Sequence, residues 1–310
     1  MFFTDWEGPW ILTDFALELS MAVFNNERFF SNLSLYDDYL AYKEKRKNYE
    51  AGYTLKLLVP FLLAAGITDR DVNEIAMNTA RFVPDADRAM ARLQKKWKPV
   101  VISTSYTQYL EKTASIIGVN GFLHGTEIEF DSLHLPHSLE KKLLDMVDEI
   151  ASLKGENLYR KLDEIFSIKE IMEILESVKA VGAGEKAKIL REYYESNNVE
   201  FPIAIGDSIS DYKMLNEAKK LGGVAIAFNG NEYALKHADI AIISSTAYSE
   251  AIVIELFMKY GEKAYQYLDD AEKELENTEI HIIEEHNFRE VLEKSKRMRV
   301  KLRGLAGELG

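Results

Sequence analysis

The sequence predicts an α/β fold in which helices cover both faces of a doubly wound parallel sheet, giving three layers. Several short runs are apolar at successive positions, as in strands that are buried on both faces. Amphipathic helical segments alternate with these runs, which is typical of a parallel sheet. The 310 residues, 47% hydrophobic and 29% charged, suffice for one large domain with a smaller addition.

Expected helices lie between the expected strands. The strands are predicted over residues 1–4, 99–103, 201–206, 223–228 and 238–243. The helices of the core are predicted over residues 85–97, 186–197, 211–221 and 232–237. In sheets of this kind ligands bind outside the carboxyl ends of the strands, so polar residues that follow a strand are the first functional candidates.

Two long segments interrupt the alternation, and a third follows it. Residues 14–79 are helical in pattern and rich in aromatic residues, and we expect them to form a cap over a pocket. Residues 138–177 predict a second helical insertion, and residues 257–310 predict a helical, charge-rich C-terminal extension. The catalytic core then comprises residues 1–13, 80–137 and 178–256.

Composition argues against several classes of protein. The formal net charge of −13 and the pI near 5.1 disfavour binding to nucleic acid or to anionic lipid. Cysteine is absent, which excludes disulfides and a thiol nucleophile. No apolar run reaches the roughly 18 residues of a membrane span, so we expect no membrane insertion. The chain does not open on a basic segment followed by an apolar one, and we therefore expect the cytoplasm. Absent cysteine and scarce glutamine indicate a thermophile.

Ionisable and hydroxyl side chains fall where the expected strands end. These residues are Asp5, Glu7, Ser103, Asp207 and Asp211. Carboxylates that converge on one crevice repel each other unless a positive charge compensates them. A hard divalent cation is the natural compensation, and Mg²⁺ suits few carboxylates together with a phosphate. Lys186, which follows a glycine-containing turn, supplies a second positive charge for phosphate oxygens.

The order and spacing of these residues resemble the four motifs of the haloacid dehalogenase (HAD) superfamily. The corresponding segments are residues 3–8 (FTDWEG), 101–105 (VISTS), 184–190 (GEKAKIL) and 205–211 (IGDSISD). The third segment is similar to that of phosphoserine phosphatases. HAD-like proteins of uncharacterised function from archaea share this overall appearance.

The resemblance implies a Mg²⁺-dependent phosphatase that acts on a small phosphorylated metabolite. Asp5 would be the nucleophile that forms an aspartyl-phosphate, and Glu7 would be the general acid and base. Ser103, Thr104 and Lys186 would bind the phosphoryl group. Asp5, Glu7 through its backbone carbonyl, Asp207 and Asp211 would hold the metal.

Some alternatives stay open. HAD phosphatases usually carry aspartate where this chain has Glu7, so a catalytically weakened binding or scaffold subunit of an archaeal complex is an alternative, as is a phosphotransferase. A neighbouring hydroxyl competes with Ser103, and Lys188 competes with Lys186. The basic run 294–303 is typical of a solvated helix face paired with the preceding acidic stretch. The extension could also bind a protein partner or a second copy of the chain.

Overall fold

The computed structural model describes residues 1–308, so the last two residues of the expected C-terminal extension lie outside it. One seven-stranded sheet has the order β3-β2-β1-β4-β5-β6-β7, and only β7 runs antiparallel to its neighbour. The strands are β1 (Phe2–Thr4), β2 (Pro99–Tyr106), β3 (Phe122–Thr126), β4 (Ile203–Gly206), β5 (Val224–Phe228), β6 (Ile240–Ser244) and β7 (Thr278–Ile282). The predicted doubly wound α/β fold is confirmed.

The five strands that were expected from the sequence form the middle of the sheet, and the two others lie at its edges. β3 contains a histidine and a glycine, and its first residue, Phe122, is exposed. β7 alternates charged or polar residues with apolar ones and adds to β6. Edge strands are partly solvated, so they lack the continuous apolar run that identifies a buried parallel strand.

Helices cover both faces of the sheet because successive residues of each strand point to opposite sides. Phe3 belongs to the apolar cluster beneath the helices of one face, whereas Phe2 belongs to the cluster on the other. The helices of the core and the extension are α5 (Ala86–Gln94), α6 (Thr107–Ile116), α11 (Ala183–Ser196), α12 (Tyr212–Lys220), α13 (Glu232–His237), α14 (Tyr248–Tyr260), α15 (Leu268–Lys273), α16 (Phe288–Arg303) and α17 (Leu305–Glu308). Short 3₁₀ segments are η2 (Phe130–Ser132), η3 (Ile209–Asp211) and η4 (Gly261–Tyr267).

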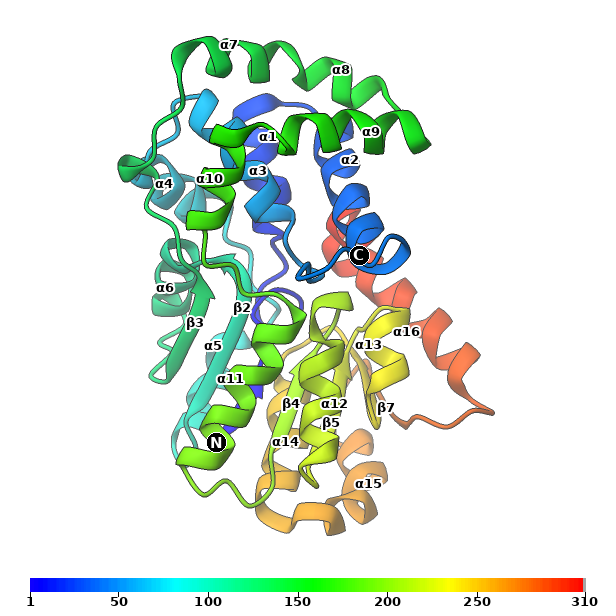
Figure 1. The fold of residues 1–310 in the computed structure, drawn as a ribbon. Helices are drawn as coiled ribbons and strands as arrows, with labels where there is room; N and C mark the ends of the chain where they lie inside the picture. Colours follow the sequence, from blue (N-terminus) through cyan, green and yellow to red (C-terminus); the bar gives the residue numbers. More distant parts are fainter. Residues whose placement is uncertain (309–310) are drawn as a thin grey trace.

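The remaining helices form a layer beyond the carboxyl ends of the strands (Figure 1). They are α1 (Phe15–Phe24), α2 (Glu27–Asp38), the π-helical turn η1 (Tyr39–Lys43), α3 (Thr54–Ala64), α4 (Asp69–Thr79), α7 (His137–Asp145), α8 (Val147–Ser152), α9 (Gly155–Phe166) and α10 (Lys169–Ser177). α2 packs against α8 and α9, and α3 packs against α7 and α10. Asn32 of α2 donates a hydrogen bond of 2.7 Å to the carbonyl oxygen of Ile150. The two insertions are therefore packed into one helical layer.

The helices of this layer begin at residues that satisfy their first amide groups. The side chain of Asp14 accepts a hydrogen bond from the amide of Leu17, and Asn26 accepts one from Phe29. Thr68 and Asp71 form a reciprocal capping box at the start of α4. Such caps contribute about 1 kcal/mol each to helix stability. The cap at Asp14 fixes where the first helix after β1 begins.

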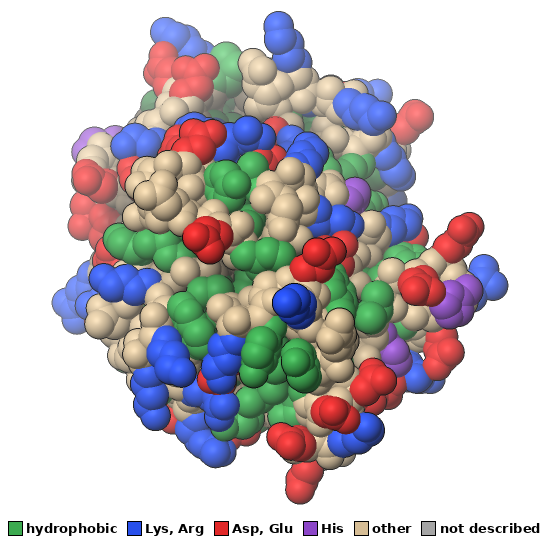
Figure 2. All heavy atoms as spheres, turned by 90° about the horizontal axis from the view of Figure 1, so that it is seen from below, with side chains coloured by type: hydrophobic (Ala, Val, Ile, Leu, Met, Phe, Trp, Pro, Cys, Tyr) green, Lys and Arg blue, Asp and Glu red, His purple; other side chains and the backbone are tan. Residues whose placement is uncertain are grey.

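The opposite end of the molecule shows acidic and basic side chains interspersed with small hydrophobic areas (Figure 2). The residues that the sequence singled out lie away from this end, at the carboxyl ends of the strands and next to the helical layer. Within residues 1–308, no helix combines the length and the apolar character needed to cross a membrane.

The C-terminal extension returns to the carboxyl ends of the strands. After β7 the chain enters α16, whose last turns approach the middle of the molecule (Figure 1). Ser295 is buried, and its hydroxyl donates a hydrogen bond of 2.7 Å to the carbonyl oxygen of Gly230, in the loop after β5. The final helical turns are thereby placed against the part of the core that carries Asp207.

Candidate active site

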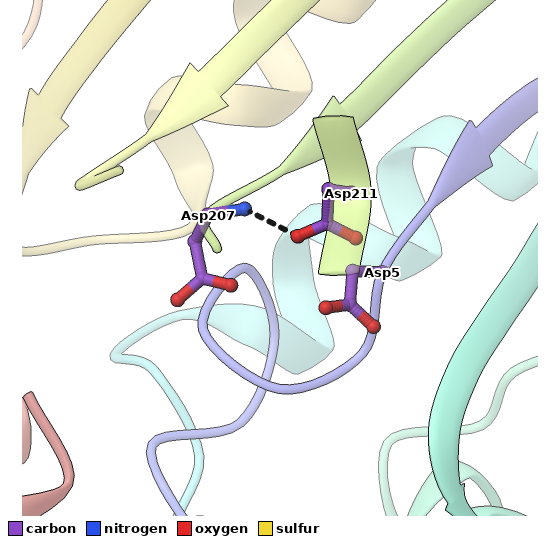
Figure 3. A group of neighbouring side chains, drawn as sticks. All are labelled: Asp5, Asp207 and Asp211. Atoms are coloured by element: carbon purple, nitrogen blue, oxygen red, sulfur yellow. Dashed lines mark hydrogen bonds between the residues drawn. The ribbon is translucent and has the colours of Figure 1, made fainter. Parts of the chain in front are cut away.

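Three buried carboxylates meet where β1 and β4 end. Asp5 follows β1, Asp207 follows β4, and Asp211 ends the short segment η3 (Figure 3). Each offers one oxygen atom, and these atoms lie within 4.8 Å of one another. The amide of Asp5 donates to the carbonyl oxygen of Ile205 at 2.9 Å, which ties the two strand ends together. The structure thus brings together three of the four residues that were expected to hold a metal.

A glycine makes room for this arrangement. Gly8 has a φ of +98°, and a Cβ atom there would collide with the carboxyl group of Asp207. A side chain at position 8 would be strained by the backbone conformation and by the lack of space. The loop after β1 can therefore pass directly beneath Asp207 only because residue 8 is glycine.

Lys186 lies beneath the carboxylates and is completely buried. Its Nζ is 2.9 Å from Asp5 Oδ1 and 2.7 Å from Asp211 Oδ1, and it donates to Ser210 Oγ at 3.2 Å. Burial alone would lower the pKa of Lys186, but the Asp211 and Asp5 carboxylates outweigh burial and raise it. Lys186 therefore stays charged. Lys188, its competitor in the sequence, is exposed and pairs with Glu185.

Asp211 serves the loop rather than the cavity. Its Oδ2 accepts hydrogen bonds from the amides of Asp207 and Ser208, each at 3.0 Å, and its Oδ1 pairs with Lys186. Both carboxylate oxygens are therefore engaged. Of the expected metal ligands, Asp211 is the one whose position supports Lys186 and the backbone of Asp207.

Asp5 and Glu7 both resist ionisation. Burial and the Asp211 carboxylate raise the pKa of Asp5, and Lys186 opposes this rise. Burial, assisted by the charge of Asp14, raises the pKa of Glu7 to about 8. Glu7 Oε1 accepts hydrogen bonds from the amide of Phe15 at 3.0 Å and from Ser105 Oγ at 3.2 Å. A carboxyl group of this kind is protonated near neutral pH and can give up a proton.

The hydroxyl groups of the second motif take different positions. Ser103 is buried, and its Oγ lies 2.6 Å from Ser105 Oγ, which in turn donates to Glu7. Thr104 lines the cavity above Asp5, whereas Ser103 is absent from that lining among the described residues. Ser103 therefore reaches Glu7 through Ser105, and Thr104 is placed nearer to a ligand.

Two arginines of α16 complete the site, and sequence reasoning did not identify them. Arg299 and Arg303 are only 4% and 7% exposed, and both pair with Asp207 Oδ2, Arg303 at 2.8 Å. The expectation of a solvated helix face for residues 294–303 is therefore wrong for these two arginines. Lys294 does pair with the acidic residues Glu279 and Glu290, in agreement with the expected pairing of this run with the preceding acidic stretch. The four-residue spacing of Ser295, Arg299 and Arg303, which places them on one helical face, is the signal that could have revealed them.

The helical layer forms one wall of the cavity that Asp5 and Asp207 line. The cavity is lined by Asp5, Glu7, Asp14, Thr104, Asp207, Ser208, Arg299 and Arg303, and by Phe30, Ser34, Asp37, Asp38 and Leu55 from the helical layer. Asp37 accepts hydrogen bonds from Tyr49, Gly52 and Thr54 at 2.8–3.2 Å, which fixes the turn before α3. Burial raises the pKa of Asp37 to about 7.

The donor set fits a hard divalent cation. Asp5 Oδ1 and Asp207 Oδ2 are engaged by Lys186 and the two arginines, whereas Asp5 Oδ2 and Asp207 Oδ1 accept no hydrogen bond from residues 1–308. Two carboxylate oxygens at the ends of neighbouring strands are the kind of ligands that Mg²⁺ takes. Within the described chain, the carboxylate of Glu7 is not part of this group.

Comparison with known proteins gives one close relative and several with the same fold. No protein-family model and no curated protein matches the chain. The solved structure of gene product AF1437 from Archaeoglobus fulgidus is 69% identical, with a TM-score of 0.98 over 100% of this chain and 98% of that one.

More distant solved structures share the architecture. A phospho-aspartyl intermediate analogue of phosphoserine phosphatase has a TM-score of 0.52 at 13% identity, over 84% of this chain and 97% of that one. A HAD family hydrolase, t0658 from Salmonella enterica serovar Typhi, has a TM-score of 0.50 at 14% identity, over 76% and 65%. At this level of identity the likeness shows the fold.

Proposed function

We propose that this chain, a member of the same family as AF1437 of Archaeoglobus fulgidus, is a Mg²⁺-dependent phosphatase of small phosphomonoesters. It has the fold of the HAD hydrolases. One observation carries the proposal. Asp5 is held by the buried Lys186 through Oδ1, it lies close to Asp207 on the same cavity, and Asp5 Oδ2 and Asp207 Oδ1 accept no hydrogen bond from residues 1–308. A nucleophile, a fixed positive charge and two free oxygen ligands are the parts that phosphoryl transfer requires.

Asp5 would attack the phosphorus atom of the bound ester as a carboxylate, the form that Lys186 and a bound Mg²⁺ would favour against the effect of burial. The bond from phosphorus to the ester oxygen breaks, and the phosphoryl group passes to the Asp5 carboxylate. Lys186 stays beside Asp5 and compensates the negative charge of the phosphoryl oxygens. A bound Mg²⁺, held by Asp5 and Asp207, would supply further charge compensation.

Glu7 would act as the general acid and then as the general base. Its raised pKa of about 8 keeps a proton available for the departing alcohol. Ser105 and the amide of Phe15 hold its Oε1, so Oε2 is the oxygen that can carry this proton. In the second half of the reaction Glu7 takes a proton from water, which attacks phosphorus and releases Asp5 and inorganic phosphate. Thr104 lines the cavity where the phosphoryl group would lie.

The cavity supports a small substrate. Side chains of the helical layer, among them Phe30 and Leu55, line the same cavity as Asp5. A phosphorylated metabolite fits a cavity with walls from both the core and the helical layer better than a phosphorylated protein segment. Transfer to an acceptor other than water stays a proposal that an acceptor-dependent rate would support.

A second candidate function rests on a specific observation. Arg299 and Arg303 both bind Asp207, so the negative charge of this expected metal ligand is compensated without a metal. Together with glutamate at position 7, this favours a binding or scaffold subunit with a weakened site. Such a protein would bind metal or phosphate without turnover.

Release of inorganic phosphate from a panel of small phosphomonoesters, with and without Mg²⁺, separates the two. We expect metal-dependent release by the native chain and none by Asp5→Asn. Glu7→Asp shortens the acid by one methylene, and a misplacement of about 1 Å can change the rate about a hundredfold. Activity that appears only in Glu7→Asp would favour the binding subunit.

A further inference from the structure

The face of α16 that carries Ser295, Arg299 and Arg303 is built into the site. Ser295 is anchored on the carbonyl oxygen of Gly230, four residues before Arg299 and eight before Arg303. Arg299 donates from Nε to the carbonyl oxygen of Gly307 at 3.1 Å and from Nη1 to Asp207. Residues four apart in a helix lie above one another, so these contacts hold Arg303 in register with the cavity.

Arg303 has a donor group that the protein does not use. Its Nε donates to the carbonyl oxygen of Leu12 at 3.1 Å, and its Nη1 donates to Asp207 Oδ2 at 2.8 Å. Its Nη2 makes no hydrogen bond with any residue in the described part of the chain, 1–308. A guanidinium group that is 93% buried normally finds partners for its five N–H groups. Because Arg303 also lines the cavity, the unused donor can meet a ligand there.

Arg303 and Lys186 approach the site from different sides. Lys186 pairs with Asp5 and Asp211, whereas Arg303 contacts Leu12 and Asp207 and lines the same cavity as Glu7. Glu7 is the residue that would protonate the departing alcohol. Lys186 is therefore the cation next to the nucleophile, and Arg303 is a separate cation on the lining of the cavity.

We propose that Arg303 is a substrate-binding residue that donates from Nη2 to an oxyanion of the ligand in the cavity. This inference rests on the proposed phosphatase function. The oxyanion belongs either to the phosphoryl group or to a second acidic group on the alcohol part. Arginine is suited to both, because its planar group forms charge-assisted hydrogen bonds with phosphate and carboxylate oxygens. Arg299, which shares Asp207 Oδ2, acts as a positioning residue for Arg303.

Calorimetric titration tests this in the presence of Mg²⁺ with three probes. Inorganic phosphate is titrated into the native chain, Arg303→Gln, Arg303→Lys and Lys301→Gln. Ethyl phosphate and phosphoglycolate, which differ by a carboxylate, are titrated into the same proteins carrying Asp5→Asn to prevent turnover. Lys301 is exposed on the same helix and serves as the matched control. Circular dichroism establishes that each variant is folded, and Arg303→Lys, which keeps the charge, serves if Arg303→Gln does not fold.

We expect Arg303→Gln to weaken binding about tenfold or more, as removal of a charge-assisted hydrogen bond to an anion does, with Lys301→Gln unchanged. Equal weakening of all three probes assigns the contact to the phosphoryl group. Weakening of phosphoglycolate alone assigns it to an acidic group of the alcohol part. The inference is overturned if folded Arg303→Gln, or Arg303→Lys where it serves in its place, binds all three probes with unchanged affinity. The proposed phosphatase function would not be affected by that result. If the native chain does not bind inorganic phosphate and Asp5→Asn binds neither ester, the proposed function itself is contradicted.

Discussion

Replacing Lys186 with methionine removes the buried positive charge that pairs with Asp5 and Asp211 and keeps most of the side-chain volume. Lys186 is completely buried and makes contacts of 2.9 Å with Asp5, 2.7 Å with Asp211 and 3.2 Å with Ser210. Breaking a buried ion pair by removing one partner costs about 3–5 kcal/mol, because an uncompensated charge remains. We expect a loss of this size in the free energy of unfolding.

Lys188→Met is the matched control on the same helix. Lys188 is exposed and pairs with Glu185 at the surface, and such pairs contribute about 0–1 kcal/mol. Guanidinium chloride unfolding of the three proteins, followed by circular dichroism without metal, measures the difference. Equal losses in Lys186→Met and Lys188→Met would refute the reasoning that burial gives Lys186 its weight.

The pH dependence of this loss gives a second check. The folded pKa of Asp5 lies above its unfolded value of about 4, so the folded form holds a proton that the unfolded form has released. Stability from this group therefore falls as the pH rises above about 4. Without Lys186 the pKa of Asp5 rises further, so the cost of Lys186→Met should be larger at about pH 8 than at about pH 5.

Two further predictions concern the loop after β1 and the helical layer. Gly8→Ala should abolish Mg²⁺ binding in calorimetry, because its Cβ atom would displace the Asp207 carboxyl group. Gly66→Ala, which is also at positive φ but in open space, should bind Mg²⁺ normally. Equal binding of Mg²⁺ by both variants would contradict this. Asp37→Asn should remove a group whose folded pKa is about 7, and whose contribution to native stability falls as the pH rises from about 4 to about 7. Over this range the free energy of unfolding of the variant should rise relative to that of the native chain by up to about 1.4 kcal/mol per pH unit. A difference in free energy of unfolding that stays constant across the range would refute this.

Much of the core could be predicted because its strands are buried on both faces. The run that becomes β5 is apolar at every position, and the first four residues of β2 are apolar as well, which identifies a buried parallel strand without knowledge of its partners. β3 and β7 could not be found in this way because edge strands carry polar residues toward solvent.

Some residues of the candidate site could be predicted from the sequence, and others could not. Asp5 and Asp207 follow strands, and parallel strands end at one edge of the sheet, so their meeting could be expected from the sequence. Arg303 could not, because a basic helix at the end of a chain is usually solvated, and its burial depends on how α16 packs. Whether Ser103 or Thr104 faces the cavity depends on the backbone after Ile102, where β2 and β3 shift register.

Covalent capture of the phosphoryl group tests the central claim most directly. The protein is mixed with Mg²⁺ and a phosphomonoester that it hydrolyses, quenched in acid, digested and analysed by mass spectrometry. We expect a phosphorylated peptide that carries the modification on Asp5 in the native chain, and no such peptide in Asp5→Asn. Phosphate release by the native chain without modification of Asp5, or modification that persists in Asp5→Asn, would contradict the role assigned to this residue.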